Sequence, residues 1–138
     1  MKIEQDYLKG LLEAFEASEE PQTDINKLLD VGYDHQSKEF IFHVRLLEDR
    51  GLIGRSDGEP GIGYYGVSTD DGEDEGFFDA VPLRLTAAGH DFLEAIRNQE
   101  VWATLKSGFK DASIGTLVTV SKELFNRALN KQLDKYFD

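Results

Sequence analysis

The stretch 37–55, SKEFIFHVRLLEDRGLIGR, constrains the fold of this chain more than any other. It holds three apolar residues at i, i+4 and i+7, which share one helical face that must be buried: Phe40, Val44 and Leu47. Ser37 is suited to cap the start of this helix, because its hydroxyl can accept a backbone N–H bond. Gly51 supplies the left-handed residue that ends it, and Leu52 and Ile53 begin a strand. The sequence therefore predicts a helix, a tight turn and a strand here.

The segment 83–96, LRLTAAGHDFLEAI, predicts a second strand followed by a second helix. Residues 83–85 alternate as in a half-buried strand, and Thr86 is suited to cap the helix. Within this helix, Gly89 permits the close approach of a neighbour and Asn98 marks a bend. Helix, strand, long loop, strand and helix form the element order of a winged helix. We therefore expect an α+β, mainly helical fold: a helix-turn-helix with a β-hairpin wing, plus flanking N- and C-terminal helices.

The length of 138 residues favours a single domain over residues 1–138. It divides into three expected parts: an N-terminal helix (1–22), a winged-helix core (23–98) and C-terminal helices (99–138). A short helix at 24–32, capped by Thr23 or Asp24, completes the helix-turn-helix; partial extension of INKLLDVGY is the alternative. The expected core includes these apolar residues: Phe40, Val44, Leu47, Leu85, Phe92, Ile96 and Trp102.

The net charge of −12 is distributed unevenly along the chain. Residues 1–36 carry −6, residues 37–55 carry +1, residues 56–83 carry −8 and residues 84–138 carry +1. Because phosphate contacts dominate nucleic-acid affinity, a chain this acidic starts at a disadvantage for DNA. Small acidic domains are also common for solubility alone.

The insertion 56–82 is rich in glycine and acidic residues, and it holds no lysine or arginine. An unstructured loop of this length is unusual in a compact domain. The piece IGYYGVS is expected to add a strand or a hairpin arm, with Tyr64, Tyr65 and Val67 in its ladder. The acidic tip would repel phosphate, and we assign it as an acidic interaction loop: Asp70, Asp71, Glu73, Asp74 and Glu75.

Several patterns in this chain match known chemical sites but fail on the physical requirements of those sites. Gly61, Gly63 and Gly66 fit the dinucleotide fingerprint G-x-G-x-x-G, but they lead into an acidic segment that is a poor helix. An EF-hand loop counted from Asp71 places Pro82 where a bidentate carboxylate is needed, which leaves weak Ca²⁺ binding by clustered carboxylates as the alternative. The chain has no cysteine, no pair of histidines at i+3 or i+4, and no G-x-S-x-G turn. We therefore expect no enzyme activity, no catalytic residue, no metal and no cofactor.

Two motifs carry a resemblance to a known family. Residues 43–53 supply the first, HxxLLxxxGLI, and residues 85–102 supply the second, LTxxGHxFLxxIRxxxVW. Over roughly residues 1–135 the chain resembles an uncharacterised family of small winged-helix-like proteins found in bacteria and their phages. The resemblance implies the fold and a phage or prophage setting, and it implies no activity and no catalytic residue. The long acidic insertion at 57–80 departs from the shorter wings of that family.

The outward face of the helix at 37–50 carries the candidate contact residues for DNA or a protein partner: Lys38, Phe42 and Arg45. In a helix-turn-helix protein this helix enters the major groove, so the element order favours a DNA-binding transcriptional regulator. The alternative is an acidic protein-interaction module that binds a basic host or phage partner without binding DNA. The −8 charge of residues 56–83 and the apolar ring of Phe42 favour this alternative.

The C-terminal segment predicts an amphipathic helix from about Thr116 onward. It carries two adjacent apolar lines: Leu117, Val120, Leu124 and Ala128, and then Phe125, Leu129, Leu133 and Tyr136. Because this stripe is wider than one neighbour needs, we expect a homodimer through this helix; packing on the first helix alone is the alternative. No apolar run is long enough to cross a bilayer and the N-terminus does not resemble a signal peptide, so we expect a cytoplasmic protein without membrane contact.

Overall fold

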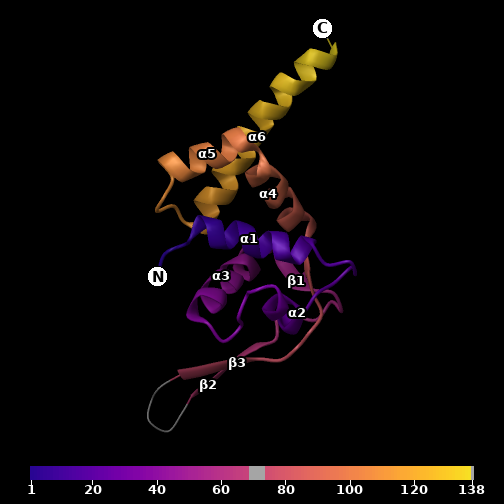
Figure 1. The fold of residues 1–138 in the computed structure, drawn as a ribbon, viewed down its shortest axis with the longest axis vertical. Coiled ribbons are helices and arrows are strands. Elements are labelled where there is room, and N and C mark those ends of the chain that lie inside the picture. Colours follow the sequence, from indigo (N-terminus) through magenta and orange to yellow (C-terminus); the bar gives the residue numbers. More distant parts are fainter. Residues whose placement is uncertain (69–73, 138) are drawn as a thin grey trace.

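The protein has an α+β fold that is mainly helical, as predicted, and our computed structural model describes residues 1–68 and 74–137 (Figure 1). The helices are α1 (Gln5–Glu16), α2 (Ile25–Asp30), α3 (Lys38–Asp49), α4 (Ala87–Arg97), α5 (Gln99–Gly108) and α6 (Ile114–Phe137). The strands are β1 (Ile53–Arg55), β2 (Tyr64–Ser68), β3 (Asp74–Phe78) and β4 (Leu83–Leu85). Within the described residues they pair as two antiparallel sheets, an inner sheet of β1 and β4 and an outer sheet of β2 and β3.

Helix α1 is shorter than the predicted helix at 1–22, and that prediction is wrong at both ends. The backbone of Glu4 is extended, so the first residues do not join the helix. At the other end, the Ser18 hydroxyl donates to the Gln22 carbonyl and accepts the Glu20 N–H. This local turn replaces a further helical turn. Four side chains of α1 face the core: Leu8, Leu11, Leu12 and Phe15.

Helices α2 and α3 form the predicted pair. The Asp24 carboxylate accepts the N–H groups of the second and third residues of α2, so the alternative of an extended segment is wrong. The Ser37 hydroxyl accepts the Phe40 N–H at the start of α3, and Gly51 after its end has a φ of 68°. The predicted inward face of α3 is confirmed, because its three apolar side chains are fully buried: Phe40, Val44 and Leu47.

The inner sheet joins the first half of the chain to the second. Ile53 pairs with Leu85 and Arg55 pairs with Leu83, which confirms the predicted hairpin over residues 53–85. Thr23 bridges Leu83 through two backbone hydrogen bonds of 2.7 and 2.8 Å. The segment before α2 is therefore tied directly to β4.

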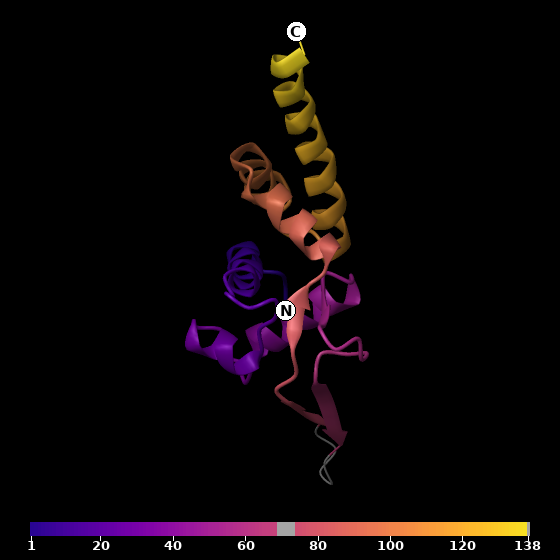
Figure 2. The same ribbon diagram turned by 90° about the vertical axis from the view of Figure 1, so that its right-hand side faces the viewer.

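The outer sheet is the predicted hairpin arm, and it extends away from the helices (Figures 1 and 2). Two aromatic pairs cross its ladder: the rings of Tyr64 and Phe78 lie 4.8 Å apart between centroids, and those of Tyr65 and Phe77 lie 5.6 Å apart. Ile62, two residues before β2, is buried and anchors the arm to the core.

Helices α4 and α5 replace the single bent helix that the sequence predicts. The backbone of Asn98 is extended and its side chain accepts two N–H groups at the start of α5, so the bend is a complete break. The expectation that Trp102 is buried is wrong, because its ring is half-buried beneath the ammonium groups of Lys9 and Lys106, at 4.6 and 5.5 Å from the centroid. The buried positions of α5 are those of Val101 and Leu105.

Helix α6 has two unlike halves. Its first half packs against α4 and α5 and buries Ile114, Leu117 and Ser121. Its second half extends beyond the rest of the molecule to the C-terminus (Figures 1 and 2). In the part of the chain that the structure describes, none of the helices combines the length and hydrophobicity that a bilayer span requires.

Candidate functional site

The outward face of α3 carries the three predicted contact residues. Lys38 and Arg45 are exposed, and Phe42 is half-buried. The Arg45 guanidinium lies 5.3 Å from the centroid of the Tyr64 ring, so the outer sheet begins beside this face. The Phe42 ring packs edge-on against the His43 ring, with 5.2 Å between centroids. The structure therefore brings the three residues together and adds contacts from the arm and the core.

A shallow hollow of about 370 Å³ lies on the same face of α3. Its apolar lining comes from Met1, Ile41, Phe42 and Leu46, and its charged lining from Lys38, Arg45 and Asp49. Surfaces that read DNA use polar groups that reach base edges and phosphates. Protein interfaces instead combine an apolar centre with a polar rim, and the lining of this hollow contains both kinds of side chain.

Acidic residues surround the outward face of α3. Glu39 and Asp49 are exposed on this helix, and Glu48 is half-buried. Burial raises the pKa of Glu48 above its ordinary value of 4.5, and the charge of Asp49 raises this pKa further against the opposing effect of Arg45. The carboxylates of Glu48 and Asp49 therefore lie close enough to interact at the end of α3.

His43 supports this face from inside, a role that the sequence reasoning did not assign. The side chain is fully buried, and the Tyr7 ring packs on it with 4.7 Å between centroids. Nε2 accepts the Glu4 N–H at 2.9 Å, and Nδ1 donates to the Glu39 carbonyl at 2.7 Å. Since a backbone N–H only donates and a carbonyl only accepts, the two bonds require a neutral ring with its proton on Nδ1. One feature of the sequence indicated that His43 is buried: it precedes Val44, which lies on the inward face of α3.

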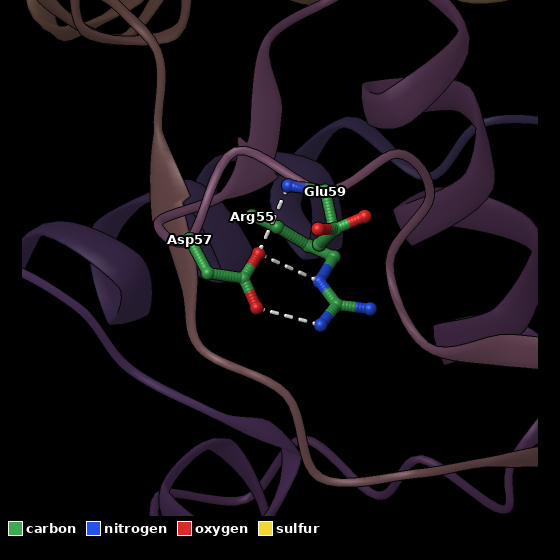
Figure 3. A network of polar contacts seen from close by, with 3 residues as sticks. All are labelled: Arg55, Asp57 and Glu59. Atoms are coloured by element: carbon green, nitrogen blue, oxygen red, sulfur yellow. Dashed lines mark hydrogen bonds and ion pairs between the residues drawn. The ribbon is translucent and has the colours of Figure 1, made fainter.

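Arg55, the last residue of β1, forms an ion pair with Asp57 (Figure 3). Nε and Nη2 of Arg55 donate to Oδ1 and Oδ2 of Asp57 at 3.0 and 2.6 Å, and the Glu59 N–H donates to Oδ1 at 3.1 Å. The hydrogen bond from Arg55 lowers the pKa of Asp57, and the Glu59 N–H lowers it further. The same hydrogen bond raises the pKa of Arg55. The charge of Arg55 is thereby neutralised locally, which weakens it as a phosphate contact.

The structure describes only two residues of the predicted acidic interaction loop. Asp70, Asp71 and Glu73 fall outside the described residues. Asp74 and Glu75 are the first two residues of β3, and their backbones pair with β2. The described part of the loop therefore belongs to a regular ladder.

The described residues offer no metal centre. Within residues 1–68 and 74–137, no group of three or more His, Cys, Asp or Glu side chains could hold a metal ion. The three histidines have different surroundings, since His43 is buried, His90 is exposed, and the His35 ring packs edge-on against Phe78 at 6.3 Å between centroids. The features that remain as a candidate site are the outward face of α3 and the arm beside it.

Comparison with known proteins places the chain in a family. The model of a family described as hypothetical protein (DUF2513) matches residues 2–115, from the segment before α1 to the start of α6. An uncharacterized protein of Haemophilus influenzae is 25% identical over 134 residues, which cover 96% of this chain and 99% of that protein. No solved structure matches the chain. Because the family model matches well over half of its residues, the chain belongs to the family described as hypothetical protein (DUF2513).

Proposed function

We propose that this chain is a winged-helix protein-interaction module that binds a basic partner through α3 and the acidic arm. Helices α2 and α3, followed by the inner hairpin and α4, have the order of a winged helix. The bridge between Thr23 and Leu83 adds one residue of a third strand to the inner sheet, on the other side of β4 from β1. In this fold α3 occupies the place of a recognition helix, with its outward face open to a partner. The resemblance noted above favours a partner from a phage or its host.

The observation that carries this proposal is the charge around the outward face of α3. A surface that binds DNA must neutralise phosphates with lysine and arginine. Here the flanking segment 56–83 has eight acidic residues and no basic one, and Arg55 is held in an ion pair. The same charges would attract and orient a basic protein. The apolar lining of the hollow on α3 supplies the centre that such an interface needs.

Affinity capture from a nuclease-treated bacterial lysate tests the proposal. One variant replaces the acidic interaction loop with serine: Asp70, Asp71, Glu73, Asp74 and Glu75. A matched control removes as many exposed carboxylates elsewhere: Glu19, Glu20, Asp30, Asp111 and Glu123. We expect the wild type and the control to retain the same basic proteins and the loop variant to lose them. Equal capture by the loop variant and the wild type would contradict the proposal.

DNA binding is the second candidate, and one observation favours it. Lys38 and Arg45 are both exposed on the outward face of α3, which is the face that enters the major groove in a helix-turn-helix protein. On this candidate, Arg45→Glu abolishes binding to genomic DNA fragments at low salt, and the loop variant binds DNA more tightly than the wild type. Arg127→Glu on α6 is the matched control, since it makes the same charge change away from α3.

We also propose that the chain forms a homodimer through α6. Four apolar side chains of its second half are exposed: Leu129 at 37%, Leu133 at 48%, Tyr136 at 77% and Phe137 at 83%. Exposed apolar rows of this kind are characteristic of surfaces that associate. Light scattering of the intact chain should give twice the monomer mass of 15.6 kDa. A monomeric mass at high protein concentration would contradict the homodimer.

A further inference from the structure

The outer sheet has two edges at which a further strand could pair. Among the residues that the structure describes, β2 and β3 pair only with each other, and they project from the helices (Figures 1 and 2). The Asp79 N–H donates to the Gly63 carbonyl at 2.8 Å, directly beyond the pair of Tyr64 and Phe78. Because hydrogen-bonded and non-hydrogen-bonded pairs alternate along an antiparallel ladder, the backbone groups of Tyr64 and Gly66 point to the outer edge of β2.

The side chains of β2 leave this outer edge open. The Tyr64 ring leans across the ladder toward β3, so that a Cβ added at Gly76 would overlap the ring and its hydroxyl. Gly66 has no side chain, and a Cβ added there would meet nothing within 4 Å. Proteins usually protect an exposed strand edge with lysine, proline or a bulge, and β2 has none of these. The outer edge of β2 is therefore an unprotected template for strand pairing.

The face of the outer sheet that turns away from α3 carries two exposed aromatic rings. Tyr65 and Phe77 are 46% and 49% exposed, and their centroids lie 5.6 Å apart. The opposite face packs on α3 through Phe78, whose ring lies 5.5 Å from that of Phe40. Since side chains of neighbouring strands meet on the same face, a residue of an added strand beside Tyr65 would contact its ring. An aromatic face attracts a cation, so arginine or lysine fits this position.

Charge selects a basic segment for this edge. Residues 56–83 have eight acidic side chains and no basic one. Among the described residues of this segment, Asp57, Glu59 and Asp79 are exposed. Pairing of the edge with a second copy of this chain would bring two such acidic segments together, which like-charge repulsion disfavours. A basic segment of another protein would instead meet opposite charge along the arm.

We propose that an extended basic segment of a protein partner pairs with the outer edge of β2 as an additional strand. The backbone groups of Tyr64 and Gly66 supply the hydrogen bonds, and an arginine or lysine of the segment lies against Tyr65. The inference rests on the proposed function and specifies how the arm holds its partner. In strand addition the main-chain hydrogen bonds give affinity, and alternate side chains give specificity.

Three short synthetic peptides and the full chain test strand addition. The first peptide alternates arginine with valine, the second has the same sequence with every backbone nitrogen methylated, and the third alternates glutamate with valine. The second keeps the charge and the side chains of the first but cannot donate the hydrogen bonds of a strand. By fluorescence anisotropy we expect the first to bind, the second to bind about tenfold more weakly or worse, and the third not to bind.

Two variants of one residue and amide hydrogen exchange locate the edge. Gly66→Pro removes an N–H that faces solvent, which an edge strand tolerates, and Gly66→Ala keeps this N–H with its methyl group in open space. We expect Gly66→Pro to weaken the first peptide about tenfold and Gly66→Ala to bind it as the wild type does. In the wild type, the first peptide should slow exchange at the amides of Tyr64 and Gly66 and leave those of Gly76 and Phe78 on the edge of β3 unchanged.

The outcomes separate this inference from the function on which it rests. Equal affinity for the first and second peptides would overturn strand addition and leave a charge-based function in place. Slowed exchange at the edge of β3 instead of β2 would also overturn it, and so would a failure of the first peptide to bind. Capture of basic proteins from the lysate decides the proposed function separately.

Discussion

The inner and outer sheets are both two-stranded and come from the same segment of chain, but the inner sheet is buried in the core whereas the outer sheet only packs against it through Tyr64 and Phe78. Ile53, Leu83 and Leu85 of the inner sheet are 3%, 0% and 4% exposed. Tyr65 and Phe77 of the outer sheet are 46% and 49% exposed, although the outer ladder is longer. We infer that the burial of a hairpin, and not the length of its ladder, decides how much it contributes to the stability of the fold.

The inner and outer sheets also differ in the charges that they carry. The one basic residue of β1, Arg55, is held in an ion pair with Asp57. Asp74 and Glu75 of the interaction loop pair in the outer ladder. On the function proposed above, the acidic charge used for binding lies in a segment whose ladder is exposed.

Truncation of a buried side chain in the inner sheet should have the largest effect on the free energy of unfolding. Leu83→Ala removes a fully buried side chain at the residue that also bridges Thr23. We expect a loss of about 2–5 kcal/mol in the free energy of unfolding, measured by urea denaturation. Leu133→Ala on the exposed half of α6 is the control, at protein concentrations where the chain is monomeric. A loss below about 1 kcal/mol for Leu83→Ala would remove the inner sheet from the core.

A methyl group at Gly89 should have the next largest effect. A Cβ at this position overlaps the carbonyl oxygen of Leu52, which accepts the Thr86 N–H between the inner sheet and α4. We expect Gly89→Ala to lower the free energy of unfolding by about 1–3 kcal/mol. Gly66→Ala in the outer sheet meets open space and should change it by no more than about 0.5 kcal/mol. Equal effects at the two glycines would erase the contrast between the sheets.

The aromatic pair of Tyr65 and Phe77 on the outer sheet should contribute little to the free energy of unfolding. Phe77→Ala removes the contact with Tyr65 across the ladder. Cross-strand pairs of this kind contribute about 0.2–1 kcal/mol to stability, so the midpoint temperature of thermal unfolding should fall by only a few degrees. A loss of several kcal/mol would show that the arm is part of the core after all.

The stability that the ion pair of Arg55 and Asp57 contributes should be lost in acid. Arg55 holds the pKa of Asp57 below its ordinary value of 3.8 in the folded protein. The stability from this pair is therefore present above that ordinary value and is lost as the pH falls through the lower folded pKa. We expect the difference in unfolding free energy between the wild type and Asp57→Asn to be constant near neutral pH and to shrink in acid. A difference that grows as the pH falls would contradict this linkage.

Much of the fold could be predicted because local chemistry determines it. The hydroxyls of Ser37 and Thr86 cap helices, and Gly51 adopts the left-handed backbone expected of it. Gly89 admits the close neighbour expected from a residue without a Cβ. The face shared by Lys38, Phe42 and Arg45 also follows from helical spacing alone.

The remaining features depend on contacts between residues distant in sequence. The bond from the Glu4 N–H to His43 spans 39 residues, and no periodicity reveals it. The side-chain amide of Gln5 donates to the carbonyls of Leu105 and Phe109, which fixes α5 against α1 across about a hundred residues. The hollow on α3 is likewise lined in part by Met1, which is distant from α3 in sequence. Such partners are known only once the chain is folded.

The most direct measurement of the central claim is the binding of labelled genomic DNA fragments to the wild type as salt is varied. A surface that neutralises phosphates loses affinity steeply as salt rises, with a slope set by the number of contacts. Our account predicts no binding by the wild type even at about 50 mM salt, because the acidic arm flanks the outward face of α3. Tight binding by the wild type that weakens steeply with salt and is abolished by Arg45→Glu would contradict the account and establish the DNA-binding function.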